Sequence, residues 1–180
     1  MIICAGNSET FEFATPMGVG LLEMTMNLTQ LALFDKPEFL LFVGSAGSYG
    51  EAKIFDIIES KTAANIELAF LNRDAYTPLE NVISTNTTNK KDIIVNSSNY
   101  ISINEKLAKN FLKPGIGIEN MEFYALLKVA QEFNIPAGGV FCITNYTNKD
   151  AHTEFLKNHE KAKELLTQHV QKRIEELIKS

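Results

Sequence analysis

Short apolar runs, each bounded by glycine or polar residues, predict the strands of this chain. Residues 2–5 and 39–43 are apolar, too short for helices and followed by glycine, as is typical of strands buried on both faces of a sheet. Residues 11–15 alternate between apolar and polar positions, which also favours a strand. Further strands are expected at residues 55–58, 93–95 and 139–144. The region between residues 58 and 93 has no clear pattern, apart from a polar stretch at 84–91 that is typical of a loop.

Three longer segments have the periodicity of helices. Apolar side chains recur at helical spacing in residues 20–34, and Pro37 stops the run because proline cannot extend a helix. Residues 120–133 repeat the pattern before Pro136. The last helix has an apolar stripe opposite a charged face, and the stripe consists of Phe155, Ala162, Leu165, Leu166, Val170, Ile174 and Leu177. This alternation of strands and helices predicts an α/β sandwich around a mostly parallel sheet, in one domain at residues 1–180.

The composition is that of an ordinary globular protein and excludes several kinds of partner. Hydrophobic residues make up 45% of the chain and charged residues 22%, which is enough apolar content for a sizeable core. The net charge is -5 and there is no basic run, so we expect no nucleic-acid partner. The apolar runs are far shorter than the roughly 20 residues of a membrane span, and the first residues lack the basic flank of a signal peptide. We therefore expect a cytoplasmic protein without a membrane partner.

The cysteines and histidines do not indicate a metal site. Cys4 and Cys142 lie in apolar strand segments, and in a reducing compartment such thiols are typically small core residues. His152, His159 and His169 have no cysteine or carboxylate at the spacing of metal ligands, so no metal is expected.

Candidate binding residues follow the predicted strands, because open α/β sheets bind ligands at the carboxyl ends of their strands. The sequence Gly-Ser-Ala-Gly-Ser at residues 44–48 offers accessible N–H groups and two hydroxyls, which suit a polar ligand or an anion. It is not a Walker A loop, since no Gly-Lys-Ser/Thr follows, and a tight turn without a ligand would also explain its glycines. Polar residues follow the strands at 93–95 and 139–144 as well.

An acidic segment, Glu-Asn-Met-Glu at residues 119–122, opens the second helix. Acidic residues at a helix start are favoured by the helix dipole, whether or not they bind anything. Met121 and Glu122 together favour a sugar site, because the apolar side chain can pack on the ring while the carboxylate accepts hydrogen bonds from two neighbouring hydroxyls.

The order of these motifs resembles the superfamily of purine nucleoside phosphorylases and methylthioadenosine/adenosylhomocysteine nucleosidases. The resemblance spans roughly residues 16–178 and rests on PEFLLFVGSAG (37–47), FDII (55–58), IENME (118–122), NIP (134–136) and the strand end TN (144–145). It implies a nucleoside-phosphorylase-like three-layer sandwich with a mixed, mostly parallel central sheet. The implied reaction is cleavage of the N-ribosidic bond of a purine nucleoside by phosphate or water, a glycosyl transfer of nucleoside metabolism and purine salvage. It needs no cofactor, although phosphate is an open co-substrate.

The resemblance also implies roles for single residues in substrate binding. Met121 and Glu122 would contact the ribose, with Glu122 holding the 2′ and 3′ hydroxyls. Ser45 and Gly47 would line the ribose or phosphate pocket, and Tyr100 would stack on the purine. The family further implies a homo-oligomer built from dimers, in which active sites borrow residues from a neighbour.

Two residues are candidates for catalysis. Asn145 stands where the nucleosidases and hexameric phosphorylases have an aspartate that protonates purine N7, whereas trimeric phosphorylases have an asparagine in a similar Ile-Thr-Asn context. An asparagine donates a hydrogen bond but no proton, which should weaken catalysis on adenine-type bases. Glu9 is the candidate for the glutamate that activates water in the nucleosidases, and the alternative is an exposed turn residue.

Departures from the family pattern leave two functions open. Phe42 stands where phosphorylases commonly have an arginine, and fewer residues precede the helix at Gly20 than is usual in the family. The chain is expected to be either an enzyme that cleaves a purine nucleoside or a non-catalytic relative that binds a nucleoside or serves as an assembly subunit. The missing arginine favours the second function.

Overall fold

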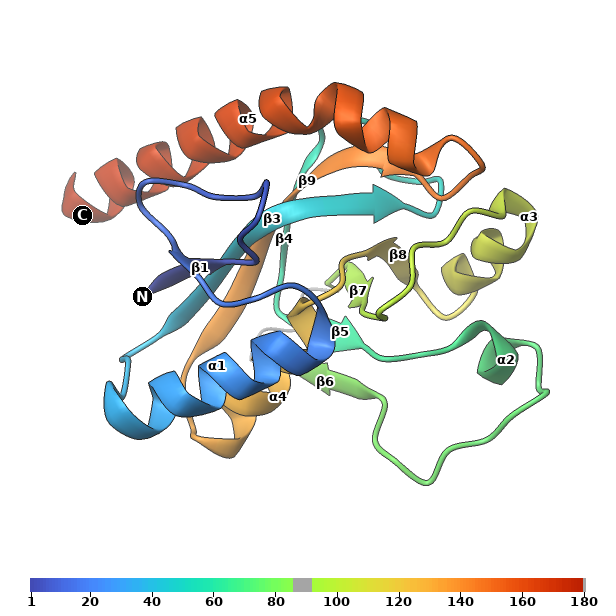
Figure 1. Ribbon diagram of the computed structural model, residues 1–180, viewed down its shortest axis with the longest axis horizontal. Helices are drawn as coiled ribbons and strands as arrows, with labels where there is room; N and C mark the ends of the chain where they lie inside the picture. The colour runs from blue at the N-terminus through green and yellow to red at the C-terminus, as the bar shows by residue number, and fades with distance from the viewer. Residues whose placement is uncertain (86–91, 180) are drawn as a thin grey trace.

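Strands and helices alternate along the chain in the computed structural model, which describes residues 1–85 and 92–179 (Figure 1). The long helices are α1 (Gly20–Phe34), α4 (Phe123–Glu132) and α5 (Ala151–Lys179), and the short ones are α2 (Leu68–Leu71), α3 (Glu105–Ala108) and the 3-10 turn η1 (Lys109–Leu112). The strands are β1 (Ile2–Cys4), β2 (Thr15–Pro16), β3 (Leu40–Ser48), β4 (Ile57–Ser60), β5 (Thr62–Ala64), β6 (Val82–Ser84), β7 (Ile94–Asn96), β8 (Ile116–Glu119) and β9 (Ala137–Tyr146).

The described strands form one mixed sheet. β3 pairs in parallel with β1 and, along its whole length, with β9, and its last residues pair antiparallel with β8. From β8 the sheet continues through the parallel strands β7 and β5 to the antiparallel β6, while β4 lies antiparallel to β9. The predicted mixed, mostly parallel sheet is confirmed.

Helices cover both faces of this sheet, which makes three layers (Figure 1). On the face covered by α1 and α4, the rings of Phe42 and Phe123 pack against Phe141, with centroids 5.7 and 5.0 Å from it. On the other face, Val43 and Cys142 pack against the α5 residues Ala162, Leu166 and Val170. Adjacent residues of a strand point to opposite faces, so apolar runs such as the one in β3 supply both cores.

The strand predicted at residues 11–15 is wrong, because only Thr15 of that segment belongs to a strand. Residues 12–14 form a turn and a bend, and the rings of Phe11 and Phe13 pack on each other with centroids 5.3 Å apart. Both rings join the core under α5. Their alternation in sequence therefore reflects a local aromatic cluster rather than the two faces of a sheet.

Smaller differences concern the ends of elements. Ile174 and Leu177, which belong to the apolar stripe predicted for the last helix, are exposed and line a groove at the amino ends of β3 and β9. The polar stretch predicted as a loop begins inside β6, and its residues 86–91 lie outside the described part of the chain.

Cys4 and Cys142 are buried and free, as predicted. In residues 1–85 and 92–179, no helix combines the length and the apolar character needed to span a membrane.

Candidate active site

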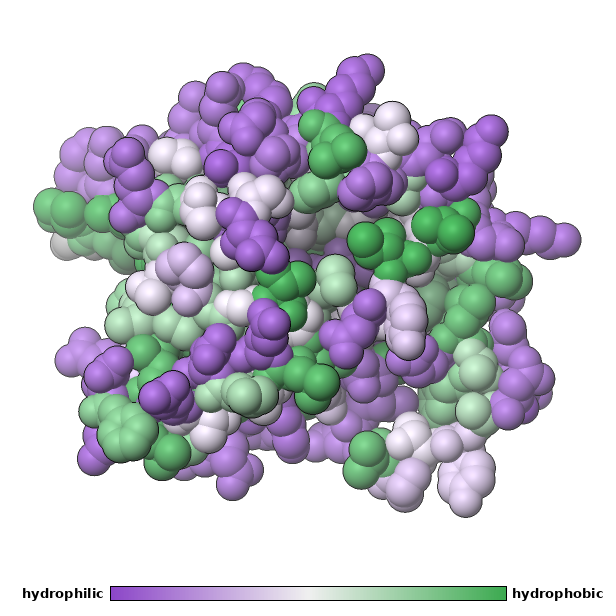
Figure 2. Space-filling model, viewed as in Figure 1, coloured by the Kyte–Doolittle hydropathy of each residue, from purple (hydrophilic) through white to green (hydrophobic). Residues whose placement is uncertain are grey.

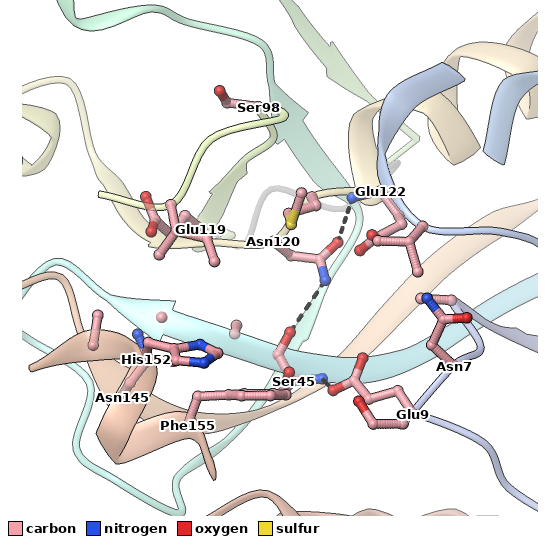
Figure 3. Close-up of a pocket in the computed structure, with 18 of the residues that line it drawn as sticks. Asn7, Glu9, Ser45, Ser98, Glu119, Asn120, Glu122, Asn145, His152 and Phe155 are labelled. Carbon is pink, nitrogen blue, oxygen red and sulfur yellow. Dashed lines mark hydrogen bonds between the residues drawn. The ribbon is translucent and has the colours of Figure 1, made fainter. Parts of the chain in front are cut away.

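A pocket of about 270 Å³ lies at the carboxyl ends of β3 and β9, closed by the loop after β1, by the end of β8 and by the start of α5 (Figure 3). The structure brings all the predicted site residues to it: Glu9, Ser45, Gly47, Tyr100, Met121, Glu122 and Asn145. These residues come from five segments that are far apart in sequence, as expected where parallel strands end at one edge of a sheet.

The glycine-rich segment at residues 44–48 is the last part of β3 and not a loop or a tight turn. Its glycines make room for neighbouring side chains. A Cβ atom on Gly44 would lie 2.7 Å from the Phe42 ring and 3.2 Å from Glu9 Oε2. Similarly, β9 continues through Asn145, so this side chain lies within a strand instead of following one.

Glu9 is held by a tight turn at residues 6–9. The backbone N–H of Gly6 and that of Glu9 each donate to the carbonyl oxygen of the other, at 3.2 and 2.9 Å. The turn needs left-handed backbone at Gly6 (φ 104°) and at Asn7 (φ 55°), a conformation that glycine and asparagine tolerate best. Glu9 is 9% exposed, and its Oε1 accepts a hydrogen bond of 2.7 Å from the Ser45 N–H. The alternative of an exposed turn residue is therefore wrong.

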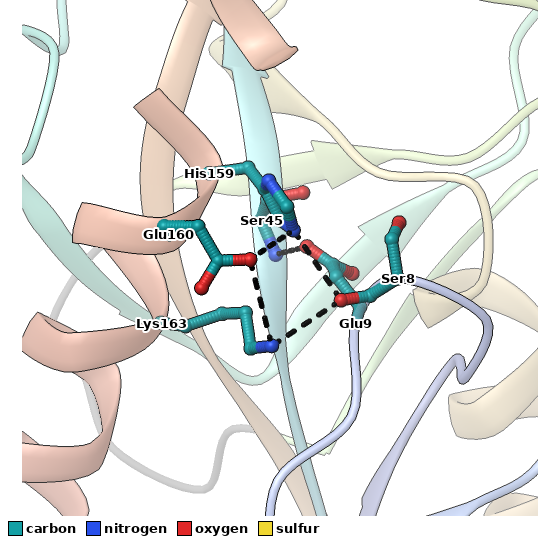
Figure 4. A network of polar contacts seen from close by, with 6 residues as sticks. All are labelled: Ser8, Glu9, Ser45, His159, Glu160 and Lys163. Atoms are coloured by element: carbon teal, nitrogen blue, oxygen red, sulfur yellow. Dashed lines mark hydrogen bonds and ion pairs between the residues drawn. The ribbon is translucent and has the colours of Figure 1, made fainter. Parts of the chain in front are cut away.

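A polar network ties this turn to α5 (Figure 4). The Ser8 carbonyl oxygen accepts hydrogen bonds from His159 Nε2 at 3.3 Å and from Lys163 Nζ at 3.4 Å. Glu160 Oε1 lies 3.2 Å from His159 Nε2 and 3.9 Å from Lys163 Nζ. Burial raises the pKa of Glu9, while the Ser45 hydrogen bond and the nearby His159 and Lys163 oppose that rise.

Glu122 joins the starts of α1 and α4. Its Oε1 accepts a hydrogen bond of 2.8 Å from the Gly20 N–H, one of the groups left unpaired at the start of a helix. The Asn120 side chain caps α4 by accepting from the N–H groups of Glu122 and Phe123, each at 3.0 Å. The same amide donates to the Ser45 carbonyl oxygen at 3.1 Å, so Glu122 and β3 keep a fixed relative position (Figure 3).

Glu122 titrates near neutral pH. It is 3% exposed, and burial raises its pKa to about 7. The Gly20 hydrogen bond lowers the pKa, whereas the negative charge of Glu9 raises it further. The charge of Glu9 thus acts on Glu122 across the pocket.

The far end of the pocket contains Asn145 and Tyr100. Asn145 is 6% exposed, and its Oδ1 accepts a hydrogen bond of 2.9 Å from the Thr144 hydroxyl. Its Nδ2 donates to the Tyr146 carbonyl oxygen at 3.2 Å, which leaves a second N–H for a ligand. Tyr100 lies at the rim in the segment after β7 and is 78% exposed, so its ring is available for stacking.

Sequence reasoning did not assign several pocket residues. Asn7, His152 and Phe155 line it, and so does Glu119 at the end of β8. His152 and Phe155 come from the first turns of α5. Phe155 was predicted only as part of the apolar stripe, and His152 was considered only as a metal ligand. Glu119 belongs to the acidic segment before α4, but a helix-start role already explained that acidity.

Solved structures of nucleosidases have this fold. Futalosine hydrolase of Helicobacter pylori strain 26695, as a mutant, matches with a TM-score of 0.79 and 17% identity over 97% of both chains. An Asp-to-Asn mutant of the Helicobacter pylori methylthioadenosine/adenosylhomocysteine nucleosidase, with 5′-methylthioadenosine in its active site, matches with a TM-score of 0.76 and 19% identity over 91% of this chain and 79% of that one. The nucleosidase of Streptococcus pneumoniae with a transition-state inhibitor has a TM-score of 0.73 and 15% identity, over 93% and 94% of the chains.

Sequence comparison points to the same group of proteins. The family model of the phosphorylase superfamily matches residues 102–178, which include β8, α4, β9 and most of α5. No curated protein sequence matches the chain. The three-layer α/β fold expected from the sequence motifs is confirmed. The match to the phosphorylase superfamily model over residues 102–178 agrees with the resemblance that those motifs carry.

Proposed function

We propose that this protein hydrolyses the N-ribosidic bond of a purine nucleoside. The observation that carries the proposal is the position of Glu9, a buried carboxyl that lines the same pocket as Glu122 and Asn145. Breaking this bond builds positive charge on the sugar and negative charge on the base. Glu122 would hold the ribose hydroxyls, Glu9 would take a proton from the attacking water, and Asn145 would donate a hydrogen bond to the base.

Electrostatics favour water over phosphate as the nucleophile. Among the described residues that line the pocket there is no lysine or arginine, whereas Glu9, Glu119 and Glu122 are all present. The two arginines of the chain lie elsewhere, since Arg173 lines the groove under the end of α5 and Arg73 follows α2. A phosphate dianion would meet carboxylates without a positively charged partner, which disfavours its binding.

A nucleoside screen tests the proposed function. Inosine, adenosine and 5′-methylthioadenosine are incubated with the protein, with and without phosphate, and free base and sugar products are separated by chromatography. We expect free base and ribose, or methylthioribose, without phosphate. A sugar 1-phosphate formed only with phosphate would indicate phosphorolysis instead. Nucleoside binding in calorimetry without any released base would favour the non-catalytic relative. That alternative has support in Asn145, because an amide has no proton that it can transfer to the base.

We also propose that the protein forms a homo-oligomer. Leu22, Met26 and Leu33 follow each other at helical spacing on α1, and all three are exposed, as is Phe34. Figure 2 shows hydrophobic side chains at the surface over α1. A second copy that covers them would remove a large apolar area from water.

Sedimentation tests this assembly. We expect a dimer or a larger species for the natural protein, and a shift toward the 20.1 kDa monomer for Met26→Glu, because a charge in a buried interface is unfavourable. Gln171→Glu is the matched control, since it adds a negative charge at an exposed position of α5, on the opposite face of the sheet. A natural protein that sediments at 20.1 kDa at micromolar concentration would contradict the proposal.

A further inference from the structure

Gly47 separates the side chains of Glu119 and Asn145 on one face of the sheet. Its register partners are Glu119 on β8 and Asn145 on β9, and paired residues of neighbouring strands point to the same face. A Cβ atom on Gly47 would lie 3.0 Å from Asn145 Nδ2, 3.2 Å from Glu119 Cγ and 3.5 Å from Glu119 Oε1. Both side chains therefore lie close to Gly47, and together with Tyr100 they line the pocket.

The Glu119 carboxyl is fixed by three hydrogen-bond donors. Oε2 accepts from the Tyr49 hydroxyl at 2.9 Å and from the Ser102 hydroxyl at 2.6 Å. Oε1 accepts from the Ser102 N–H at 2.9 Å, its one partner among the described residues, so it has capacity for a ligand. Tyr49 is itself buried and stacks on Phe111 at a centroid distance of 4.5 Å. Such a rigid carboxyl is suited to a positioned chemical role.

We propose that Glu119 is the general acid that protonates the departing purine, a step that Asn145 cannot perform. The proposal rests on the proposed hydrolysis. As the C1′–N9 bond breaks, its electron pair moves to the base and the Glu119 proton is transferred to a ring nitrogen. Water forms the new bond to C1′ and gives its proton to Glu9. The Glu119 carboxylate left behind is stabilised by Tyr49 and Ser102, and solvent then restores both protonation states.

The electrostatic surroundings of Glu119 agree with this role. Burial raises its pKa, while the hydrogen bonds from Ser102 and Tyr49 oppose the rise. The other titratable groups that line the same pocket are Glu9, Tyr100, Glu122 and His152, and Glu67 lines the adjoining cavity. None of these brings a fixed positive charge to Glu119, so the proton is retained to a higher pH than on an exposed glutamate.

A comparison of two leaving groups tests the role of Glu119. In Glu119→Gln, turnover of inosine or adenosine should fall by about 100-fold or more, the usual contribution of a general acid. Turnover of p-nitrophenyl β-D-ribofuranoside should change little, because p-nitrophenolate leaves without protonation. When turnover of the purine substrates by Glu119→Gln is measured against pH, its fall at alkaline pH should no longer be seen. Adding Asn145→Asp to Glu119→Gln should restore purine turnover, since it supplies a carboxyl on the other side of Gly47.

Two further variants separate chemistry from folding. Tyr49→Phe keeps the buried ring but removes one donor to Glu119, so the fall in purine turnover at alkaline pH should move to higher pH. Glu51→Gln makes the same chemical change at an exposed site in the bend after β3 and is the matched control. Equal losses on both substrates in Glu119→Gln, or unchanged purine turnover, would overturn the role of Glu119 while hydrolysis stands. A natural protein that releases neither base nor p-nitrophenol would overturn the proposed function, and this role with it.

Discussion

Glu9→Gln is expected to slow base release from purine nucleosides by about 100-fold to 10,000-fold, while nucleoside affinity changes little. Glutamine has the same shape, and its oxygen can still accept the 2.7 Å hydrogen bond from the Ser45 N–H. It cannot take a proton from water, so the chemical step is lost and the pocket is kept. Product release in a single-turnover assay measures the first effect, and calorimetry with the same nucleoside measures the second.

The matched control for this change is Glu12→Gln, an exposed glutamate in the same loop. Its activity should equal that of the natural protein. A second effect of Glu9→Gln provides an independent check, because the negative charge of Glu9 raises the pKa of Glu122. Without that charge Glu122 should ionise at lower pH, so the pH dependence of nucleoside binding should shift downward. Full activity of Glu9→Gln would contradict the assignment of Glu9 as the base.

Glu122→Gln is expected to stabilise the protein at pH 8 by roughly 1 to 3 kcal/mol. The pKa of Glu122 is about 7 in the folded protein, against an ordinary value of 4.5. The folded state therefore binds the proton more tightly than the unfolded chain, and the free energy of unfolding falls as pH rises from about 4.5 to 7. A neutral glutamine avoids this loss and can still accept the Gly20 hydrogen bond.

Urea denaturation at pH 5, 6, 7 and 8 measures this effect. The profile of Glu122→Gln should be flatter than that of the natural protein, although Glu9 and Glu119, whose pKa values are also raised, leave part of the slope. Glu132→Gln, at the exposed end of α4, should leave the profile unchanged. If the free energy of unfolding changed with pH by the same slope in Glu122→Gln and in the natural protein, a pKa of about 7 for Glu122 would be contradicted.

The same substitution should weaken nucleoside binding, so stability and function respond in opposite directions. A carboxylate that accepts hydrogen bonds from the 2′ and 3′ hydroxyls loses charge assistance when it becomes an amide. Calorimetry should therefore show a larger loss of affinity for ribonucleosides than for 2′-deoxyribonucleosides. Equal losses for both sugars would indicate that Glu122 only joins α1 to α4.

The long helices and strands were predictable from the sequence, because each buries a continuous stripe or run of apolar residues. Helix α1 begins and ends at the residues expected, since the spacing of Met24, Leu28 and Leu31 is unambiguous and Pro37 follows. Among the short elements of residues 60–112, β7 (Ile94–Asn96) lies where a strand was expected at residues 93–95, but the others were not predictable. β5, β6, α2 and α3 have three or four residues each, too few to establish a period.

The candidate site was predictable where chemistry is encoded in a short motif. Met121 and Glu122 are neighbours in sequence, and Ser45 and Gly47 lie in one glycine-rich segment, so sequence motifs alone indicated both. Glu119 could not be assigned in this way, because its place beside Asn145 depends on the pairing of β8 and β9 with β3. Long-range strand register of this kind is not visible in a local pattern.

The attachment of the Glu9 turn to α5 has a consequence for how the site assembles during synthesis. His159 and Ser8, which share a hydrogen bond, are 151 residues apart in the chain. At about 5 to 20 residues per second, the turn leaves the ribosome many seconds before the helix that fixes it. Until α5 packs on β3 and β9, the nascent chain contains Glu9, but the turn that holds this residue lacks its hydrogen bonds to α5. Release of free base by stalled nascent chains should therefore appear only once α5 has emerged.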